Sequence, residues 1–561
     1  MNELFRRLFL HKPLAAQIIV ASFFINILFL ASPIFVIQIL SRYIGYGFDG
    51  TLYTLTIGML IALVLGMGFG IIRTKMCSIV SEESDHRLQS QVLDGLARIK
   101  AAAMERIPPA RIQDVLAGPQ IIQNAYEASR IASVLDMPFF LLFVLAIFVL
   151  SPALAIITLL AVVGTVVAGK LNMDKTRKLE NGLREESVRH RGSVNSAITG
   201  TETVRAFHGG EYLKRLWDEQ IGRLMEAKDR IVNQRSWSLS IVQAVNSLLK
   251  VAIYAVGAKL VVTGDLSVGA LIGASILSAK ALQISSSFMQ TALQLGMAED
   301  AMRQINEFIN LPRETGGGKG MREYSGRLEL HDVAMAFPGA TGPLFESLSY
   351  VIEPGTVVGI MGANGTGKTT LVKLIVGLLD PGRGQVLADG VDLRQLAPEW
   401  WRRQVMYLPQ EPMFLNGSYK DNITLLNPEI DGAQLNEIVR QADLRRFLDG
   451  TATGIDTQIA DAGRSLPMGI RKRLALARAL VGNGRLAVFD EPTEGLDTEG
   501  CEAIFQVMNS LVQRGVSIVL VSRDPSIVKG YGAIIDLNSK PVPKVGLVRK
   551  KSAPESGANR M

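Results

Sequence analysis

The stretch Gly362-Ala-Asn-Gly-Thr-Gly-Lys-Thr369 decides the fold of the second half of the chain. It follows the apolar run Val357–Met361 and precedes the helical run Thr370–Leu379. A strand, a glycine-rich loop and a helix in this order predict a P-loop, in which backbone N–H groups surround phosphate oxygens. We expect Lys368 to reach the β- and γ-phosphates of ATP and Thr369 to hold Mg²⁺. The expected nucleotide-binding residues of this motif are Gly362, Ala363, Asn364, Gly365, Thr366, Gly367, Lys368, Thr369 and Thr370.

A second motif supplies two carboxylates. The apolar run Leu486–Phe489 ends in Asp490 and Glu491. Such a run predicts a buried parallel strand, and ligands bind at the carboxyl ends of parallel strands. We expect Asp490 to contact the Mg²⁺ shell and Glu491 to polarise the attacking water as the catalytic base. An apolar run that ends in Asp-Glu is weak evidence alone, so this assignment depends on the P-loop in the same chain.

The overall composition indicates a membrane protein. Of the 561 residues, 48% are hydrophobic, more than soluble domains usually carry. The net charge of +7 is compatible with nucleic-acid binding, but few aromatic residues lie among the basic ones. We therefore assign the excess to loops beside anionic membrane lipid and expect no nucleic-acid partner. Cys77 and Cys501 lie far apart and predict neither a disulfide framework nor a metal site.

Apolar segments predict six transmembrane helices, because about 20 apolar residues cross the hydrocarbon core. One segment, Met137–Gly169, carries no charge and is broken at Ser151-Pro152, which makes it two spans joined by a tight turn. The other segments are Pro13–Ser41, Thr51–Ile72, Ser236–Gly264 and Leu266–Met297.

Loop charges predict the orientation. The stretches 73–130 and 170–235 are dense in Lys and Arg, whereas the other connections carry almost none. The positive-inside rule then places the termini and both long loops in the cytoplasm, in a multi-pass protein of the inner (plasma) membrane. The long loops look helical, so we expect the spanning helices to continue beyond the membrane. Short helices near Gly118–Asn124 and His208–Trp217 are candidates to touch the ATPase.

These patterns divide the chain into domains. We expect no cleavable signal peptide, because the first apolar run is too long for one. The leader has Leu4, Phe5, Leu8 and Phe9 on one side, as an interfacial helix would. The predicted divisions are the leader 1–12, the six-helix transmembrane domain 13–297, a linker 298–326 with the flexible stretch 315–320, a nucleotide-binding domain 327–540 and a disordered basic tail 541–561.

Two lysines, Lys250 and Lys280, lie inside predicted spans. A charge inside the membrane is costly and usually faces a cavity or a partner. The last span is also rich in Ser and Gln, so one of its faces is expected to line a polar pathway. The alternative is helix–helix hydrogen bonding or snorkelling of the lysines.

Residues 327–540 resemble the nucleotide-binding domain of ABC transporters. The resemblance implies that Phe337 stacks on adenine and that Gln410, in Tyr407-Leu-Pro-Gln410, links Mg²⁺ to the membrane part. It further implies a D-loop at Glu494-Gly-Leu-Asp497, with Asp497 at its end. The implied fold class is an α-helical six-span transmembrane domain of the type I ABC exporter kind, followed by an α/β P-loop domain. ATP and Mg²⁺ are the implied cofactors.

The membrane half resembles the type I secretion ATPase/permeases, in the branch that lacks an N-terminal peptidase domain. The resemblance rests on Ser32–Leu40, Asp136–Phe140, Gly269–Leu277 and Lys280–Leu282. It implies ATP-driven export of a secreted protein, with a periplasmic adaptor and an outer-membrane channel as partners. A lipid, peptide or drug exporter is the alternative, and a catalytically weak regulatory subunit is another.

Two motifs depart from the family. The ABC signature Leu-Ser-Gly-Gly-Gln is replaced by Leu466, Pro467, Met468, Gly469 and Ile470. Pro467 offers neither the hydroxyl nor the N–H of serine, and Met468 is bulky where backbone should approach phosphate. Arg523 replaces the family's switch histidine. We therefore expect a heterodimer with a second ABC half-transporter that supplies an intact signature; drift in a functional homodimer is the alternative.

Overall fold

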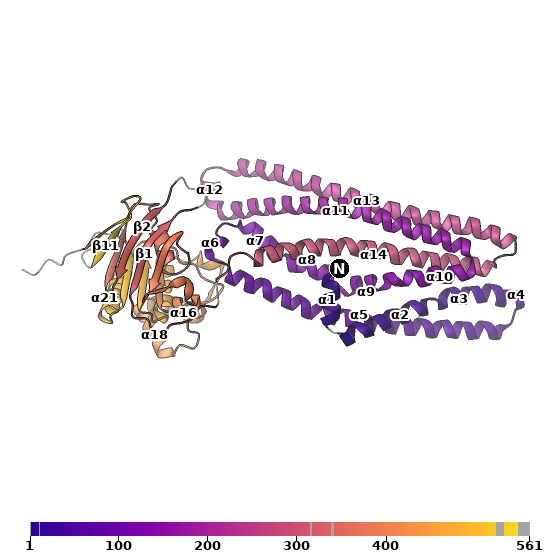
Figure 1. Cartoon of the computed structure of the whole chain (residues 1–561), viewed down its shortest axis with the longest axis horizontal. Helices are drawn as coiled ribbons and strands as arrows, with labels where there is room; N and C mark the ends of the chain where they lie inside the picture. Colours follow the sequence, from indigo (N-terminus) through magenta and orange to yellow (C-terminus); the bar gives the residue numbers. More distant parts are fainter. Residues whose placement is uncertain (1, 11, 315–316, 338–341, 523–531, 548–561) are drawn as a thin grey trace, which may run out of the picture. The chain divides into compact units, whose positions relative to one another are not determined.

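The computed structural model describes residues 2–10, 12–314, 317–337, 342–522 and 532–547, and the chain divides into two compact units (Figure 1). Unit 1 comprises residues 1–99 and 105–311, and unit 2 comprises residues 100–104 and 312–561. Unit 1 is helical, whereas unit 2 contains the sheets.

Six helices among the described residues are long and apolar enough to cross a membrane, which confirms the predicted number. The first, Lys12–Tyr46, consists of α2 (Lys12–Phe29), α3 (Ala31–Gln38), a π-helical turn (Ile39–Tyr43) and α4 (Ile44–Tyr46). The third combines α9 (Ala128–Asp136), a 3₁₀ turn (Met137–Phe139) and α10 (Phe140–Leu150). The others are α5 (Asp49–Arg98), α11 (Pro152–Thr199), α13 (Gly210–Val262) and α14 (Val268–Ile309).

The break at Ser151-Pro152 is confirmed, because α10 ends at Leu150 and α11 begins at Pro152. Proline suits a first helical position, where its missing N–H has no partner to lose. Helices α5, α11 and α13 have 50, 48 and 53 residues. At about 1.5 Å per residue they exceed the roughly 30 Å hydrocarbon thickness by far.

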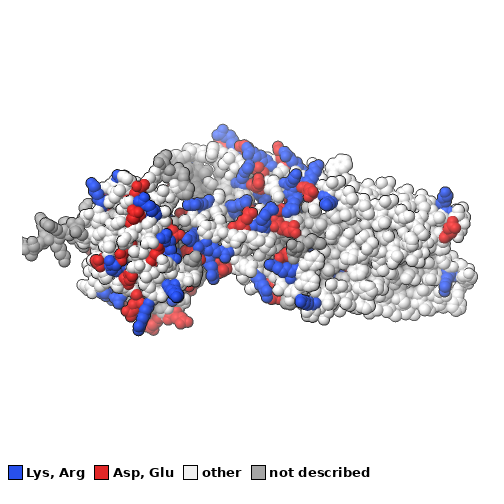
Figure 2. Space-filling view, in the orientation of Figure 1, with Lys and Arg blue, Asp and Glu red and all other residues white. Residues whose placement is uncertain are grey.

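In Figure 2 the charged side chains of this unit gather over one part of the long helices, with a broad uncharged region between them and the α4 end.

Helix α14 is the most buried span, with 61% of its apolar window inside the bundle. Small residues let it approach α3: a Cβ on Gly273 would lie 2.6 Å from Cδ1 of Ile37, and one on Gly269 would lie 2.9 Å from the Ile37 carbonyl oxygen. Close approach through small residues is typical of helix pairs in membranes. Two of the segments that carried the branch resemblance therefore pack on each other.

A buried arginine, Arg7, joins the N-terminal helix α1 (Asn2–Leu10) to α5. Leu4 and Leu8 are buried, whereas Phe5 and Phe9 are exposed and stacked on one another, so the four apolar residues do not share one environment as predicted. Between them, Arg7 is 1% exposed. Its guanidinium lies 2.8 Å from the Asp85 carboxylate and 4.3 Å from the ring centroid of Tyr126.

We expect Arg7→Met to lower the free energy of unfolding by about 3–5 kcal/mol, because removing one partner leaves Asp85 buried without its counter-charge. The measurement is thermal unfolding of the purified protein in detergent. Arg6→Met is the matched control: the Arg6 side chain is 69% exposed and pairs with Glu3 at the surface. That variant should lose less than about 1 kcal/mol. Equal losses in the two variants would contradict the buried role of Arg7.

Of the two loop stretches expected to be short helices, the first is one, whereas residues 210–217 of the second begin the long helix α13. Their contact with the ATPase stays a prediction. Gly118–Asn124 falls in α8 (Gly118–Ala125), which packs in unit 1: a Cβ on Gly118 would lie 3.0 Å from Cδ1 of Ile305 in α14. The preceding helix is α7 (Pro109–Leu116), and the second long loop has α12 (Thr201–Ala206). The loop segment that belongs to unit 2 is residues 100–104 with α6 (Ala101–Met104), where Ala102 packs against the core.

Unit 2 is built on a central sheet with the described strand order β12-β11-β3-β10-β9-β6. All its pairings are parallel except that of β11 with β12. The strands are β3 (Val357–Met361), β6 (Val405–Leu408), β9 (Leu486–Asp490), β10 (Ser517–Val521), β11 (Ala533–Asp536) and β12 (Lys544–Leu547). Phe489 and Leu520 face one apolar core, and Val488 and Val519 face another, so these strands are covered on both faces.

A second, antiparallel sheet has the order β2-β1-β4-β5 among the described residues. Its strands are β1 (Leu328–Met335), β2 (Phe345–Ile352), β4 (Arg383–Ala388) and β5 (Val391–Asp392); β7 (Gly417–Ser418) pairs with β8 (Gln458–Ile459) elsewhere. The α-helices of unit 2 besides α6 are α15 (Lys368–Ile375), α16 (Pro398–Arg403), α17 (Tyr419–Ile423), α18 (Gly432–Gln441), α19 (Arg445–Asp449), α20 (Met468–Val481) and α21 (Thr498–Gln513).

The expected linker and tail are partly ordered. Residues 298–309 continue α14, and Gly318 packs on the backbone of unit 2, where an added Cβ would lie 2.2 Å from the Leu396 carbonyl carbon. Arg402 also holds Glu314 through two hydrogen bonds. Glycine is therefore needed at 318 for close approach rather than for flexibility. Residues 544–547 of the expected tail form β12, and 548–561 lie outside the described residues.

Candidate functional site

Strand order explains why the motif residues meet. Strand β10 lies between β3 and β9, with Val521 opposite both Ile360 and Asp490. The P-loop leaves the carboxyl end of β3, and Glu491 follows β9. Their shared edge of a parallel sheet is where such folds bind ligands. Position 523, which follows β10 closely, was predicted to carry the switch residue; Arg523 lies outside the described residues.

The P-loop wraps around the Lys368 ammonium. The Lys368 Nζ donates to the carbonyl oxygens of Gly362 and Ala363 at 2.8 and 3.2 Å. Gly367 has φ +106° and lies against Leu344, so a side chain there would be strained and would clash. Helix α15 begins at Lys368, and its first N–H groups are therefore free of intrahelical partners and suited to phosphate.

The segment after β11 braces this loop, which the sequence did not predict. The Asn538 Oδ1 accepts a hydrogen bond from the Ala363 N–H at 2.8 Å. The Lys540 Nζ donates to the Thr366 carbonyl oxygen at 3.0 Å. These residues lie more than 170 positions from the P-loop, so only the pairing of β11 with β3 brings them there.

Asp490 and Thr369 form the candidate Mg²⁺ position. Burial raises the pKa of Asp490, and neighbouring Glu491 raises it too, whereas a hydrogen bond from Thr369 and the Lys368 charge lower it. The Asp490 Oδ2 is buried with no hydrogen-bond partner among the described residues. A buried carboxylate oxygen beside a threonine hydroxyl is a donor set that suits Mg²⁺. The residues present therefore fit a Mg²⁺–nucleotide complex.

We expect Asp490→Asn to leave the nucleotide-free protein as stable as the wild type or more stable. The sign follows from the raised pKa of Asp490: burial penalises the ionised carboxylate in the folded state, and above that pKa this penalty lowers stability. Saturating ATP near 100 times Kd should stabilise the wild type by about 2.7 kcal/mol. In Asp490→Asn, adding Mg²⁺ should no longer increase the rise in thermal midpoint that ATP causes.

The control for this prediction is Asp449→Asn, whose side chain is 74% exposed. It should keep the full response to Mg²⁺ and ATP. A Mg²⁺-dependent stabilisation that survives in Asp490→Asn would remove Asp490 from the metal position.

Glu491 has an unusual backbone conformation, with φ +47°. This left-handed region is sparsely populated by residues other than glycine and is often found at functional sites. Its N–H donates to the Val521 carbonyl oxygen at 3.0 Å, and its carbonyl oxygen accepts from the Lys472 ammonium. The side chain is buried, beside Asp490 at the end of β9.

Two other predicted nucleotide residues lie on exposed loops. The Gln410 Nε2 donates to the Glu494 Oε2 at 3.0 Å, which ties the segment after β6 to the predicted D-loop. Phe337, after β1, is 44% exposed, so its ring is accessible from solvent. Residues 338–341 beside it lie outside the described residues.

The altered signature lies at the start of α20. Pro467 is the N-cap residue and makes no side-chain capping bond. Met468 packs on the chain's own predicted D-loop: a Cβ on Gly495 would lie 3.1 Å from the Met468 Cγ. Leu466 and Ile470 pack against the apolar core, and Gly469 lies near Gly495 and Leu496. Asp497 caps α21 through the Gly500 N–H and accepts from Arg473 at 2.6 Å.

In unit 1 the two intramembrane lysines differ. Lys250 is exposed, whereas Lys280 is partly buried with its ammonium 4.6 Å from the ring centroid of Phe29. Ser278, on the same helix as Lys280, is buried and hydrogen-bonded to Thr158 at 2.7 Å. That pair is helix–helix bonding, the alternative considered for the polar residues of the last span.

An ionic cluster lies near Lys280 that the sequence pattern does not predict. The Arg73 guanidinium pairs with Asp136 at 2.7 Å, and the Asn26 amide donates to the same carboxylate oxygen at 2.9 Å. These residues come from α5, α9 and α2. Asp136 belongs to the segment 136–140, on which the branch resemblance partly rests. Its contacts with Arg73 and Asn26 join three spans.

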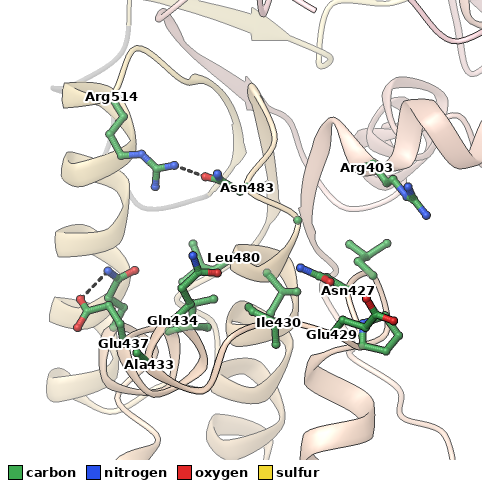
Figure 3. Close-up of a pocket in the computed structure, with 16 residues that line it drawn as sticks. Arg403, Asn427, Glu429, Ile430, Ala433, Gln434, Glu437, Leu480, Asn483 and Arg514 are labelled. Carbon is green, nitrogen blue, oxygen red and sulfur yellow. Dashed lines mark hydrogen bonds between the residues drawn. The ribbon is translucent and has the colours of Figure 1, made fainter. Parts of the chain in front are cut away.

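A separate hollow in unit 2, of about 880 Å³, lies between α18 and the ends of α20 and α21 (Figure 3). Asn427, Ile430 and Gln434 line it, and Arg514 reaches Asn483 at its edge. None of its described lining residues belongs to the P-loop or to the end of β9, so it is not the nucleotide site.

Comparisons with protein families agree with the two units. Residues 16–285 match the family "ABC transporter transmembrane region", and residues 345–494 match the family "ABC transporter". Among solved structures, a bacterial Atm1-family ABC exporter with ATP bound superimposes with a TM-score of 0.86 over 96% of this chain and 95% of the other. At 19% sequence identity this likeness concerns the fold.

Curated relatives are similar over nearly the whole chain. The exotoxin translocation ATP-binding protein PaxB of Pasteurella aerogenes is 25% identical over 94% of this chain and 74% of its own length. The alpha-hemolysin translocation ATP-binding protein HlyB of Escherichia coli O157:H7 is 26% identical over 94% and 75%. The toxin RTX-I translocation ATP-binding protein of Actinobacillus pleuropneumoniae is 25% identical over 98% and 77%.

Proposed function

We propose that this chain, which belongs to the ABC exporters and couples ATP hydrolysis to transport, is the ATP-binding and permease subunit of a type I protein secretion exporter. One observation carries the proposal: the relatives that match 94–98% of the chain are named as toxin translocation proteins. The substrate is then a polypeptide that leaves through the inner membrane, with a periplasmic adaptor and an outer-membrane channel as partners.

The proposed orientation places the termini and unit 2 in the cytoplasm, with the spans in the inner (plasma) membrane. The density of Lys and Arg in the stretches 73–130 and 170–235 supports it, because positive loops are retained in the cytoplasm. The exposed Phe5 and Phe9 of α1 suit a helix that lies in the interface beside the first span.

For ATP binding and hydrolysis we propose separate roles for the residues at the end of the central sheet. The P-loop and Lys368 bind the phosphates of ATP, and Phe337 stacks on its base. Thr369, Asp490 and Gln410 would hold Mg²⁺, which when bound neutralises charge on the β- and γ-phosphates. Glu491 accepts the proton of the attacking water as general base. Arg523, in the switch position, offers a fixed cation to the γ-phosphate.

We further propose that the working unit is a heterodimer with a second ABC half-transporter. In the family the signature of one subunit caps the nucleotide of the other. Pro467 has no N–H for the phosphate, and Met468 occupies space where a glycine would leave backbone exposed. This subunit would thus bind and hydrolyse ATP under a partner's intact signature, while the site capped by α20 would be slow.

Deleting the gene tests the secretion role. We expect one large secreted protein to disappear from the culture medium, with secretion restored by the wild-type gene and not by Lys368→Ala. Unchanged secretion, with an altered lipid or drug-resistance profile, would favour the alternative exporter. Copurification of the tagged full-length chain tests the dimer: recovery of a second ABC half-transporter supports the heterodimer, and recovery of this chain alone as a dimer contradicts it.

A further inference from the structure

A buried lysine lies behind the proposed catalytic base. Lys472 is the fifth residue of α20 and is 1% exposed, among the largest fully buried side chains of the described chain. Its neighbours along the helix, Leu474 and Ala475, belong to the apolar core. A charged side chain is rarely buried to this extent unless it is paired.

The Lys472 ammonium is directed at the segment after β9. Its Nζ donates to the carbonyl oxygen of Glu491, which also accepts from the Glu494 N–H at 3.3 Å. Burial lowers the pKa of Lys472, while the carboxylates of Glu494, Glu491 and Asp490 raise it. The lysine therefore has one backbone acceptor and a set of negative charges around it.

We propose that Lys472 is a positioning residue that holds Glu491 in its left-handed backbone conformation and ties the signature helix to this subunit's own catalytic base. The inference rests on the proposed role of Glu491. Its geometric basis is that Glu491, at φ +47°, is fixed on both sides: its N–H by Val521 and its carbonyl oxygen by Lys472. A residue in a sparsely populated conformation persists only when its surroundings hold it there.

A second contact makes the same connection. Arg473, the next residue of α20, donates to the Asp497 carboxylate at 2.6 Å and pairs with Asp443 at 3.0 Å. Lys472 and Arg473, which are adjacent on α20, therefore bind the first and the last residue of the segment Glu491–Asp497. A shift of α20, whose N-terminus carries the signature, would therefore move the base. This gives a physical route by which a movement of the signature helix reaches the base of this subunit's own site.

The test compares Lys472→Met, Lys472→Gln and Lys420→Met in the full-length protein, purified with any partner that copurifies. Methionine fills the space without a donor, and glutamine keeps an N–H donor without the charge. We expect kcat for ATP hydrolysis to fall roughly tenfold to a hundredfold in Lys472→Met, with little change in the Kd for ATP, because the base is misplaced while the P-loop is intact. Lys472→Gln should recover part of the loss, and the exposed Lys420 should be neutral.

A purely structural role would give a different pattern: both Lys472 variants would lower ATP binding and the thermal midpoint along with kcat. That result, or a wild-type kcat in Lys472→Met, would overturn the inference. If Lys472→Met does not fold, Lys472→Gln still decides, since an intermediate kcat with an unchanged Kd is expected. Glu491→Gln is measured in parallel: if it keeps full activity the role of the base fails, and if it is inactive while Lys472→Met is normal only the Lys472 role fails.

Discussion

Replacing Glu491 with glutamine is expected to lower kcat for ATP hydrolysis by roughly 10²–10⁴-fold, the usual contribution of a general base. Glutamine has nearly the same shape and keeps the backbone contacts of Glu491 with Val521 and Lys472. It cannot accept a proton from water at neutral pH. The measurement is steady-state ATPase of the purified full-length protein, together with its copurified partner, and ATP binding should remain almost unchanged.

The matched control is Glu494→Gln, three residues further on, whose carboxylate bonds the Gln410 amide at an exposed position. We expect this change to lower kcat far less, because Glu494 is exposed and is not the residue proposed to accept the proton of water. If the two variants lose similar activity, the loss reflects the conformation of the whole segment and not proton transfer by Glu491. Hydrolysis that is insensitive to Glu491→Gln would place the chemistry in the partner's site.

The sequence predicts the parts of this molecule that depend on local pattern. The length of the apolar segments is enough to predict six spans, because the thickness of the hydrocarbon core sets the length that each helix needs. Ser151-Pro152 is enough for the tight turn, since proline begins α11. The P-loop and the acidic end of β9 follow from a strand–loop–helix pattern and a buried apolar run. Each of these features is complete within about 20 residues.

What it does not predict are pairings that only tertiary packing creates. Arg73 meets Asp136 across 63 residues, and Asn538 reaches the Ala363 N–H across 175. Lys472 looks like one more basic residue in Arg471-Lys-Arg473 until the helix is placed, and only burial marks it out. The expectation of a flexible stretch was wrong at Gly318 for the same reason, because composition does not distinguish a flexible linker from a close approach of backbone segments within unit 2.

Restoring the signature should raise activity. We expect the pair Pro467→Ser and Met468→Gly to increase ATP hydrolysis at the site under α20 at least about tenfold, since a donor aimed at phosphate charge is typically worth 10²–10³ in kcat and only part of the family's signature is rebuilt. In a heterodimer the total rate rises less, because the other site is already capped by the partner's signature. The serine also supplies the side-chain cap that α20 lacks, worth about 1 kcal/mol, which helps to offset the lost packing of Met468 on Gly495. Steady-state ATPase and thermal unfolding of the same preparation measure both effects.

A companion variant separates the contribution of the serine hydroxyl from that of the backbone N–H. Pro467→Ala with Met468→Gly restores the backbone N–H without the hydroxyl, so activity between that of the wild type and the serine variant is expected if both donors contact phosphate. The gain should also depend on the partner: in a heterodimer only the site under α20 accelerates, whereas in a homodimer both sites do. An unchanged rate in a well-folded serine variant would mean that α20 does not cap a nucleotide, and the slow step would then lie at position 523 or in the membrane domain.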